Sequence, residues 1–168
     1  SLLPAFPTLR PYVELLLDRP GFFVMFWNSV KLAVGVLLGQ LLTGIPASWW
    51  FAHSPRRRAR WLFPVYIVLM LMPFQVTMVG NYIVLDQMNL LDTHWSLLLP
   101  GAFSTFPVFI AYRFFRAIPE AVLEAAEIDG AGRLQTFFHI GLPLGKAGVA
   151  SALVLGFLEC WSAIEQPM

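Results

Sequence analysis

The sequence predicts an all-α protein that crosses a membrane several times. Of its 168 residues, 58% are hydrophobic and only 12% are charged. The mean hydropathy is +0.68, and together these values are typical of membrane proteins. A helix needs about 20 mostly apolar residues to cross a bilayer. Four segments satisfy this requirement, and we expect them to be spans: 22–47, 61–82, 95–112 and 147–166.

Aromatic residues and prolines support the positions of these segments. Tryptophans lie toward the segment ends, as their amphipathic rings favour the membrane–water interface: Trp27, Trp49, Trp50, Trp61, Trp95 and Trp161. Proline lacks the N–H that a helix interior uses, so kinks or helix ends are expected at Pro64, Pro73, Pro100 and Pro107. We expect a single domain, 1–168, and because Ser1 is not an initiator we expect it to be part of a longer chain.

The first expected span also carries a signal for helix packing. Gly35 and Gly39 are four residues apart, a spacing of small residues that lets two helices approach closely. We expect this face to pack within the chain rather than against a separate chain. Lys31, near the start of the same span, is expected to extend its ammonium group to the interface.

The distribution of basic residues predicts the orientation of the spans. Eight of the 11 Lys and Arg residues lie in two loops that four spans place on one side of the membrane: Arg56, Arg57, Arg58 and Arg60 in one, and Arg113, Arg116, Arg133 and Lys146 in the other. The loop 83–94 on the opposite side has Asp86 and Asp92 but no Lys or Arg. Because basic loops remain in the cytoplasm, we expect a multi-pass inner (plasma) membrane protein with loop 113–146 inside the cell.

Segment 120–130 predicts a short amphipathic helix within that loop. Its spacing of i, i+4 and i+7 places three acids on one face: Glu120, Glu124 and Glu127. Ala125 and Ala126 are small enough to let another protein approach closely. A solvated linker on the membrane surface is the alternative, but helices of that kind favour Lys and Arg on their polar face. The pattern therefore favours a helix that binds a cytoplasmic protein.

The ends of this helix are also predicted. Pro119 suits the first helical turn, where its missing N–H would be unpaired in any case. Asp129 and Gly130 follow the last periodic residues, and glycine adopts the left-handed conformation that commonly ends a helix. We therefore expect a helix with a tight turn directly after it.

The same loop resembles a known signature. The pattern E-A-A-x3-G-x9-I-x-L-P marks the membrane-spanning subunits of binding-protein-dependent ABC importers, and it is matched with its spacing by Glu124, Ala125, Ala126, Gly130, Ile140, Leu142 and Pro143. The strings 114–119 and 128–131 resemble most the carbohydrate-type branch, which includes the maltose permeases. The resemblance extends from about Asn28 to the end of the chain.

This resemblance implies a function and a set of partners. Glu124, Ala125, Ala126 and Gly130 would form the coupling helix that binds in a cleft of a cytoplasmic ATPase subunit, and Glu120 and Asp129 complete the expected docking surface. The chain would form half of a translocation pathway for a solute, expected to be a sugar or polyol. A second permease subunit would supply the other half, and an extracytoplasmic solute-binding protein would bind on the side of loop 83–94.

Pathway residues are expected among the polar side chains of the spans, because such residues are costly in lipid and often line pathways. Gln75, Glu159 and Ser162 are the candidates, and an interhelical hydrogen bond is the alternative for each. Weaker candidates lie near the outer mouth: Asn81, Tyr82 and Asp86. Glu165 is expected at the periplasmic interface. The family usually has Trp-Asn-Asp near this point, which is replaced here by Glu-Cys-Trp-Ser-Ala-Ile-Glu.

Enzyme chemistry is not expected in this chain. The string 141–147 differs from a phosphate-binding loop in its glycine spacing, and Ala147 stands where a Ser or Thr must bind magnesium. We therefore expect no cofactor here, with ATP and Mg²⁺ on the partner ATPase. The histidines and the cysteine lack metal-ligand spacing: His53, His94, His139 and Cys160. The run 56–60 favours topology or contact with membrane lipid over nucleic acid.

A different function class is also compatible with the sequence. A polytopic membrane anchor could recruit a cytoplasmic partner through the same helix without transporting anything. The two classes differ in whether a pathway exists. Gln75 and Glu159 facing one cavity would favour transport, whereas both facing lipid or dry packing would favour the anchor.

Overall fold

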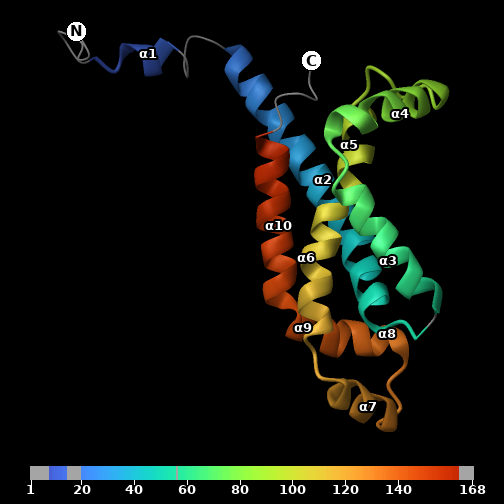
Figure 1. The fold of residues 1–168 in the computed structure, drawn as a ribbon. Helices are drawn as coiled ribbons and strands as arrows, with labels where there is room; N and C mark the ends of the chain where they lie inside the picture. The colour runs from blue at the N-terminus through green and yellow to red at the C-terminus, as the bar shows by residue number, and fades with distance from the viewer. Residues whose placement is uncertain (1–7, 15–19, 56, 163–168) are drawn as a thin grey trace, which may run out of the picture.

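The computed structural model describes residues 8–14, 20–55 and 57–162 (Figure 1). Within these residues the regular elements are all helical, which confirms the predicted all-α class. In chain order they are α1 (Arg10–Val13), α2 (Pro20–His53), α3 (Arg57–Met70), α4 (Phe74–Gln87), α5 (Trp95–Ala102), α6 (Thr105–Arg116), α7 (Glu120–Ile128), α8 (Arg133–Thr136), a π-helical turn (Phe137–Gly141), α9 (Leu142–Leu144) and α10 (Lys146–Trp161).

A bundle of long helices forms the centre of the molecule. α2 packs against α5, α6 and α10, and α10 packs against α6 as well. In Figure 1 the bundle runs from α4 at one end to α7 and α8 at the other. Gly35 and Gly39 of α2 lie so close to Leu98 and Ala102 of α5 that a Cβ on either glycine would overlap its neighbour. The expected use of these glycines for packing within the chain is therefore confirmed.

Two of the described helices are long and apolar enough to cross a membrane, Gly21–His53 and Trp95–Arg116. The number rises to four if each of two bent helix pairs is one span. α2 continues past the expected end at residue 47 and includes Pro46 in its interior. Its last turns bury Ser48 and Ala52 against other elements, and this packing extends the helix beyond the predicted boundary.

The segment expected to be the second span, 61–82, is divided into two helices. α3 and α4 meet at an angle of 104°. Pro73 directly precedes α4 in an extended conformation, with φ −65° and ψ 145°. Because proline has no N–H to donate to the preceding turn, the helix ends here, as expected for Pro73. Pro64, by contrast, lies within α3 without ending it.

The other two expected spans differ from their predicted limits in smaller ways. Segment 95–112 consists of α5 and α6, which are separated by Phe103 and Ser104, and α6 continues to Arg116. The last span begins at Lys146 and is helical to Trp161. Residues 163–166 of the expected span 147–166, which include Glu165, lie outside the described residues.

The most buried core lies toward the α7 end of the bundle. Its buried members are Ile45, Ala52, Ala111, Phe115, Ile118 and Phe137. The ring of Trp49 lies edge-on to that of Phe115, with centroids 5.3 Å apart, and 5.7 Å from that of Phe137. Because these rings come from α2, α6 and the π-helical turn, the cluster fixes the loop after α7 to the bundle.

We predict that Phe115→Ala lowers the free energy of unfolding by about 3–5 kcal/mol, because it removes a fully buried ring and leaves a cavity. Phe115 is 0% exposed, whereas its neighbour Phe114 is 41% exposed. Phe114→Ala is therefore a matched control with a smaller expected loss. Denaturant titration in detergent micelles, followed by tryptophan fluorescence, measures both. Equal losses in the two variants would contradict a core centred on Phe115.

Candidate functional site

α7 is a short helix that extends from the end of the bundle opposite α4 (Figure 1). Pro119 precedes it in an extended conformation, with φ −61° and ψ 136°. The sequence predicted Pro119 within the first turn, and the structure places it one step earlier, as the N-cap residue. Its fixed φ suits either position, so helix formation from Glu120 onward is retained.

The turn after α7 has the expected conformation. Gly130 has φ +82°, in the left-handed region that glycine adopts at little cost. Its N–H donates to Glu127 O at 3.0 Å, and the N–H of Ala131 donates to Ala126 O at 2.9 Å. A Cβ on Gly130 would meet no atom within 4 Å. Glycine is therefore required here by backbone conformation rather than by lack of space.

The two alanines of the signature face in different directions. Ala126 is 6% exposed and faces the rest of the chain, whereas Ala125 is exposed. Ile128 is 85% exposed. The two small residues expected to form one surface are thus divided, and Ala125 lies on the outward side together with the exposed side chains of Val122 and Ile128.

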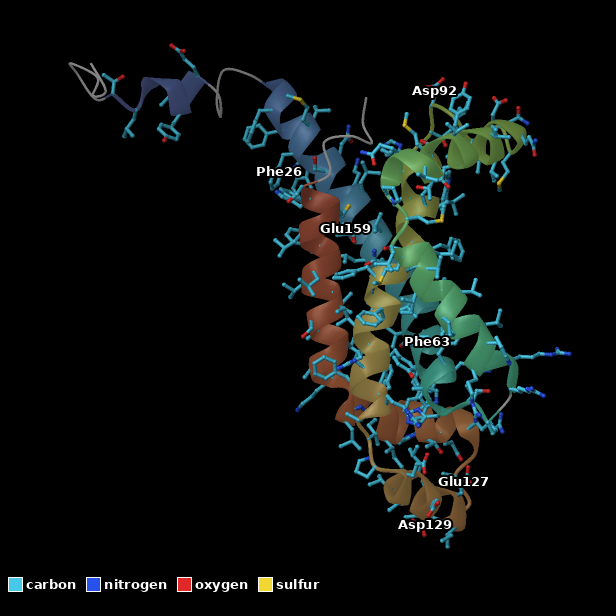
Figure 2. The ribbon with its side chains drawn as sticks, viewed as in Figure 1. Phe26, Phe63, Asp92, Glu127, Asp129 and Glu159 are labelled. Atoms are coloured by element: carbon cyan, nitrogen blue, oxygen red, sulfur yellow. The ribbon has the colours of Figure 1, made fainter. Side chains whose placement is uncertain are left out.

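The acidic face of α7 borders a cavity of about 960 Å³. Figure 2 shows Glu127 on this helix, near the elements that follow it. Six charged residues of opposite sign line the cavity: Glu120, Glu124 and Glu127 of α7, and Arg60, Arg116 and Arg133 of other elements. Aromatic side chains complete the wall, including Trp49, Phe63 and Tyr112. The acids therefore lie between α7 and the bundle as well as at the surface.

Arg116 connects three elements at this site. Its Nη1 lies 3.8 Å from Oε1 of Glu120 and donates to Ala52 O at 3.3 Å. The ion pair is exposed on both sides, so we assign it no more than about 1 kcal/mol. The contribution of Arg116 is to connect elements, because at the end of α6 it contacts both the end of α2 and the first turn of α7.

The residues after α7 hold the loop against the bundle. A Cβ on Gly141 would overlap the ring of Trp49, and one on Gly145 would overlap that of Phe115. Leu142, from the signature, packs against the aromatic core. Both glycines of the string 141–147 thus allow close packing.

The expected pathway residues do not form one cluster. Gln75 is exposed in the first turn of α4, Glu159 is exposed near the end of α10, and Ser162 is exposed directly after it. None of the three lines the cavity beside α7. Figure 2 shows Glu159 at the bundle end far from Glu127. In a single chain these residues are open to lipid or to another subunit.

Two polar residues that sequence reasoning overlooked are placed more specifically. Gln40 is 3% exposed in the middle of α2, and its Nε2 donates to Gly101 O at 3.0 Å. Thr43 lies 3.0 Å from Ala102 O. The signal was available, since an amide within an apolar run is costly unless it has a partner. Among the described residues, no group of three or more His, Cys, Asp or Glu is arranged to hold a metal ion.

Comparison with known proteins identifies the family. Residues 44–164 match the family described as the binding-protein-dependent transport system inner membrane component. The sn-glycerol-3-phosphate transport system permease protein UgpE of Yersinia pestis bv. Antiqua is 33% identical over 150 residues, which are 88% of this chain and 52% of that protein. The lactose transport system permease protein LacG of Rhizobium radiobacter is 30% identical over 146 residues, covering 86% and 53%.

A solved structure agrees with the fold. It is the crystal structure of a bacterial ABC transporter involved in the import of the acidic polysaccharide alginate, with a TM-score of 0.85 at 22% identity, over 96% of this chain and 56% of that one. The chain spans about half the length of the curated relatives it matches. The two permeases agree with the resemblance to the carbohydrate-type branch, and the chain belongs to the family of binding-protein-dependent transport system inner membrane components.

Proposed function

We propose that this protein is the membrane subunit of an ABC importer and forms half of a translocation pathway, with a second permease subunit as the other half. The observation that carries the proposal is α7, an exposed helix with its own left-handed turn, in a chain of this permease family. A half-pathway also accounts for Gln75, Glu159 and Ser162, which a single chain leaves exposed. The glycerol-3-phosphate and lactose permeases among its relatives support a sugar or polyol solute.

In this proposal α7 couples transport to two cytoplasmic ATPase subunits, which bind ATP and Mg²⁺. Closure of the ATPase pair on ATP moves the two α7 helices, and the spans alternate between inward and outward access. Motion of α7 reaches α6 through the three residues 117–119 and reaches α2 through Arg116, which contacts Ala52 and Glu120. In the same proposal, a solute-binding protein delivers the solute on the α4 side of the inner membrane. The helix α7 then lies on the opposite side, in the cytoplasm.

Reconstitution of the complete transporter tests this function. The full-length chain is co-expressed with its neighbouring permease, ATPase and binding protein, purified, and inserted into liposomes. We expect the ATPase to co-purify and labelled sugar to enter only when ATP and the binding protein are both present. Co-purification of a cytoplasmic partner with no ATP-dependent uptake of any sugar or polyol would instead indicate a membrane anchor.

We predict that Glu124→Lys weakens association with the ATPase subunit, because it reverses a charge at the centre of the predicted docking surface. The matched control is Asp86→Lys, an exposed acid in α4 at the other end of the bundle. Quantitative co-purification in detergent measures the effect, with a lower yield of ATPase expected for Glu124→Lys only. An unchanged yield would exclude an electrostatic role for Glu124.

We predict that Gly130→Val uncouples ATP hydrolysis from transport, because a β-branched residue is strained at φ +82° by about 1–2 kcal/mol. Gly132→Val is the matched control, since Gly132 has φ −72° and ψ 162°. Gly130→Asn tests the mechanism further, because asparagine tolerates the left-handed region. The ratio of solute transported to ATP hydrolysed should fall for Gly130→Val and remain near wild type for the other two. Wild-type coupling in Gly130→Val would contradict the role of this turn.

A further inference from the structure

The span formed by α5 and α6 is interrupted between its two helices. α5 ends at Ala102 and α6 begins at Thr105, with Ser104 between them in an extended conformation of φ −53° and ψ 136°. Pro107 follows, and because it has no N–H it offers nothing to the carbonyl of Phe103. The carbonyl of Phe103 therefore loses its helical donor, whereas Gly101 O still accepts from the N–H of Ser104 at 3.2 Å. An unpaired carbonyl is costly in lipid.

Two side chains of α2 supply donors to this break. Nε2 of Gln40 donates to Gly101 O at 3.0 Å, and Oγ1 of Thr43 lies 3.0 Å from Ala102 O. Gln40 and Thr43 are three residues apart and so share one face of α2. Gly39 brings that face close, because a Cβ there would overlap Ala102. The carbonyls of Gly101 and Ala102, which are adjacent in α5, are thus contacted by two polar side chains from one face of α2.

The two contacts differ in how easily they are released. A hydroxyl has one proton to donate, and Oγ1 of Thr43 lies 2.8 Å from Gly39 O of its own helix as well as 3.0 Å from Ala102 O. When α5 moves away, Thr43 keeps the bond to Gly39. Gln40 has no such second partner for Nε2 among the described contacts, so its bond to Gly101 O is the one that motion must break.

Helix α10 holds Gln40 in place from the other side. A Cβ on Gly156 would overlap Oε1 of Gln40, and that oxygen is buried without a hydrogen-bond partner. An unpaired buried amide oxygen is costly, so the close fit of Gly156 keeps the amide aimed at Gly101 at the expense of its own acceptor. Three helices therefore meet at one amide: α2, α5 and α10.

We propose that Gln40 and Thr43 form a releasable latch on the break at Phe103–Ser104, and that the α5–α6 span bends there during transport. This inference rests on the proposed function, because the motion originates at α7. α6 leads into α7 through residues 117–119, so displacement of α7 acts on α6. The break allows α6 to move relative to α5, and Gln40 is the positioning residue that holds the end of α5 against α2.

The test measures the angle between α5 and α6 directly. Spin labels are placed on cysteines at Trp95, near the start of α5, and Arg113, near the end of α6, after Cys160→Ala removes the native thiol. The complete transporter is studied in lipid nanodiscs by electron–electron distance measurement without nucleotide. We expect one dominant distance in the otherwise native protein, and in Gln40→Leu a second distance whose share relative to the first rises roughly threefold to tenfold.

Two further variants and a matched control sharpen this comparison. Gly156→Ala leaves Gln40 unchanged but displaces its amide, so the same second distance should appear. Thr43→Val should have a smaller effect, because Thr43 has an alternative acceptor in its own helix. Ser151→Ala is the control, since Ser151 donates to Ala147 O of its own helix at 2.8 Å, and it should match the parent. An unchanged distance in both Gln40→Leu and Gly156→Ala overturns the latch.

The same distance measured with trapped nucleotide tests whether the span bends during transport. When the spin-labelled parent complex, with Gln40 unchanged, is trapped with ATP and vanadate, we expect the second distance to become dominant. A distance that does not respond to trapped nucleotide, in a complex that retains its ATPase subunits, overturns bending during transport. Failure of the proposed function is recognised separately, as absence of the ATPase from the purified complex, and the comparison of variants without nucleotide does not depend on that result.

Discussion

The contact between two glycines and two aromatic rings determines how the loop 113–146 is held. Gly141 lies against Trp49 of α2 and Gly145 against Phe115 of α6, each too close for a Cβ. Trp49 and Phe115 are themselves packed edge-on, so the loop, the first span and the third span share one rigid cluster. α7 extends from this cluster on short connections at both ends, and its orientation relative to the spans is therefore set by the packing behind it rather than by α7 itself.

The interior of the bundle follows from a second constraint, which is that backbone polar groups in lipid need partners within the protein. At Pro73 the chain solves this by ending one helix and starting another at 104°. At Phe103–Ser104 it keeps the span and supplies donors from Gln40 and Thr43 of α2. Both solutions begin at a helix interruption near a proline, and at the second one side-chain hydrogen bonds join the end of α5 to the neighbouring helix α2.

Local signals in the sequence predicted local structure well. The acid spacing and Gly130 define α7 and its turn, because both depend on residues within a few positions of one another. Gly35 and Gly39 predicted close packing, although only the structure identifies Leu98 and Ala102 of α5 as the partners. The separation of Ala125 from Ala126 into outward and inward residues was not predictable, since it depends on where α7 lies relative to the bundle. Gln40 was not predictable as an interhelical contact, because its partners Gly101 and Gly156 are distant in sequence and meet it only once α5 and α10 are packed around α2.

These features bear on whether the chain transports or only anchors. A static anchor gains nothing from a broken span, since each interruption must be compensated by polar side chains that an apolar helix would not need. A subunit that moves, as proposed, does gain, because at this break the bond from Gln40 to Gly101 O can be released while Thr43 keeps its bond to Gly39 O. The same logic applies to Arg116, whose exposed ion pair adds little stability but joins α6, α2 and α7 at the point where motion would enter. The proposed transport function accounts for these features, whereas a static anchor would not need them.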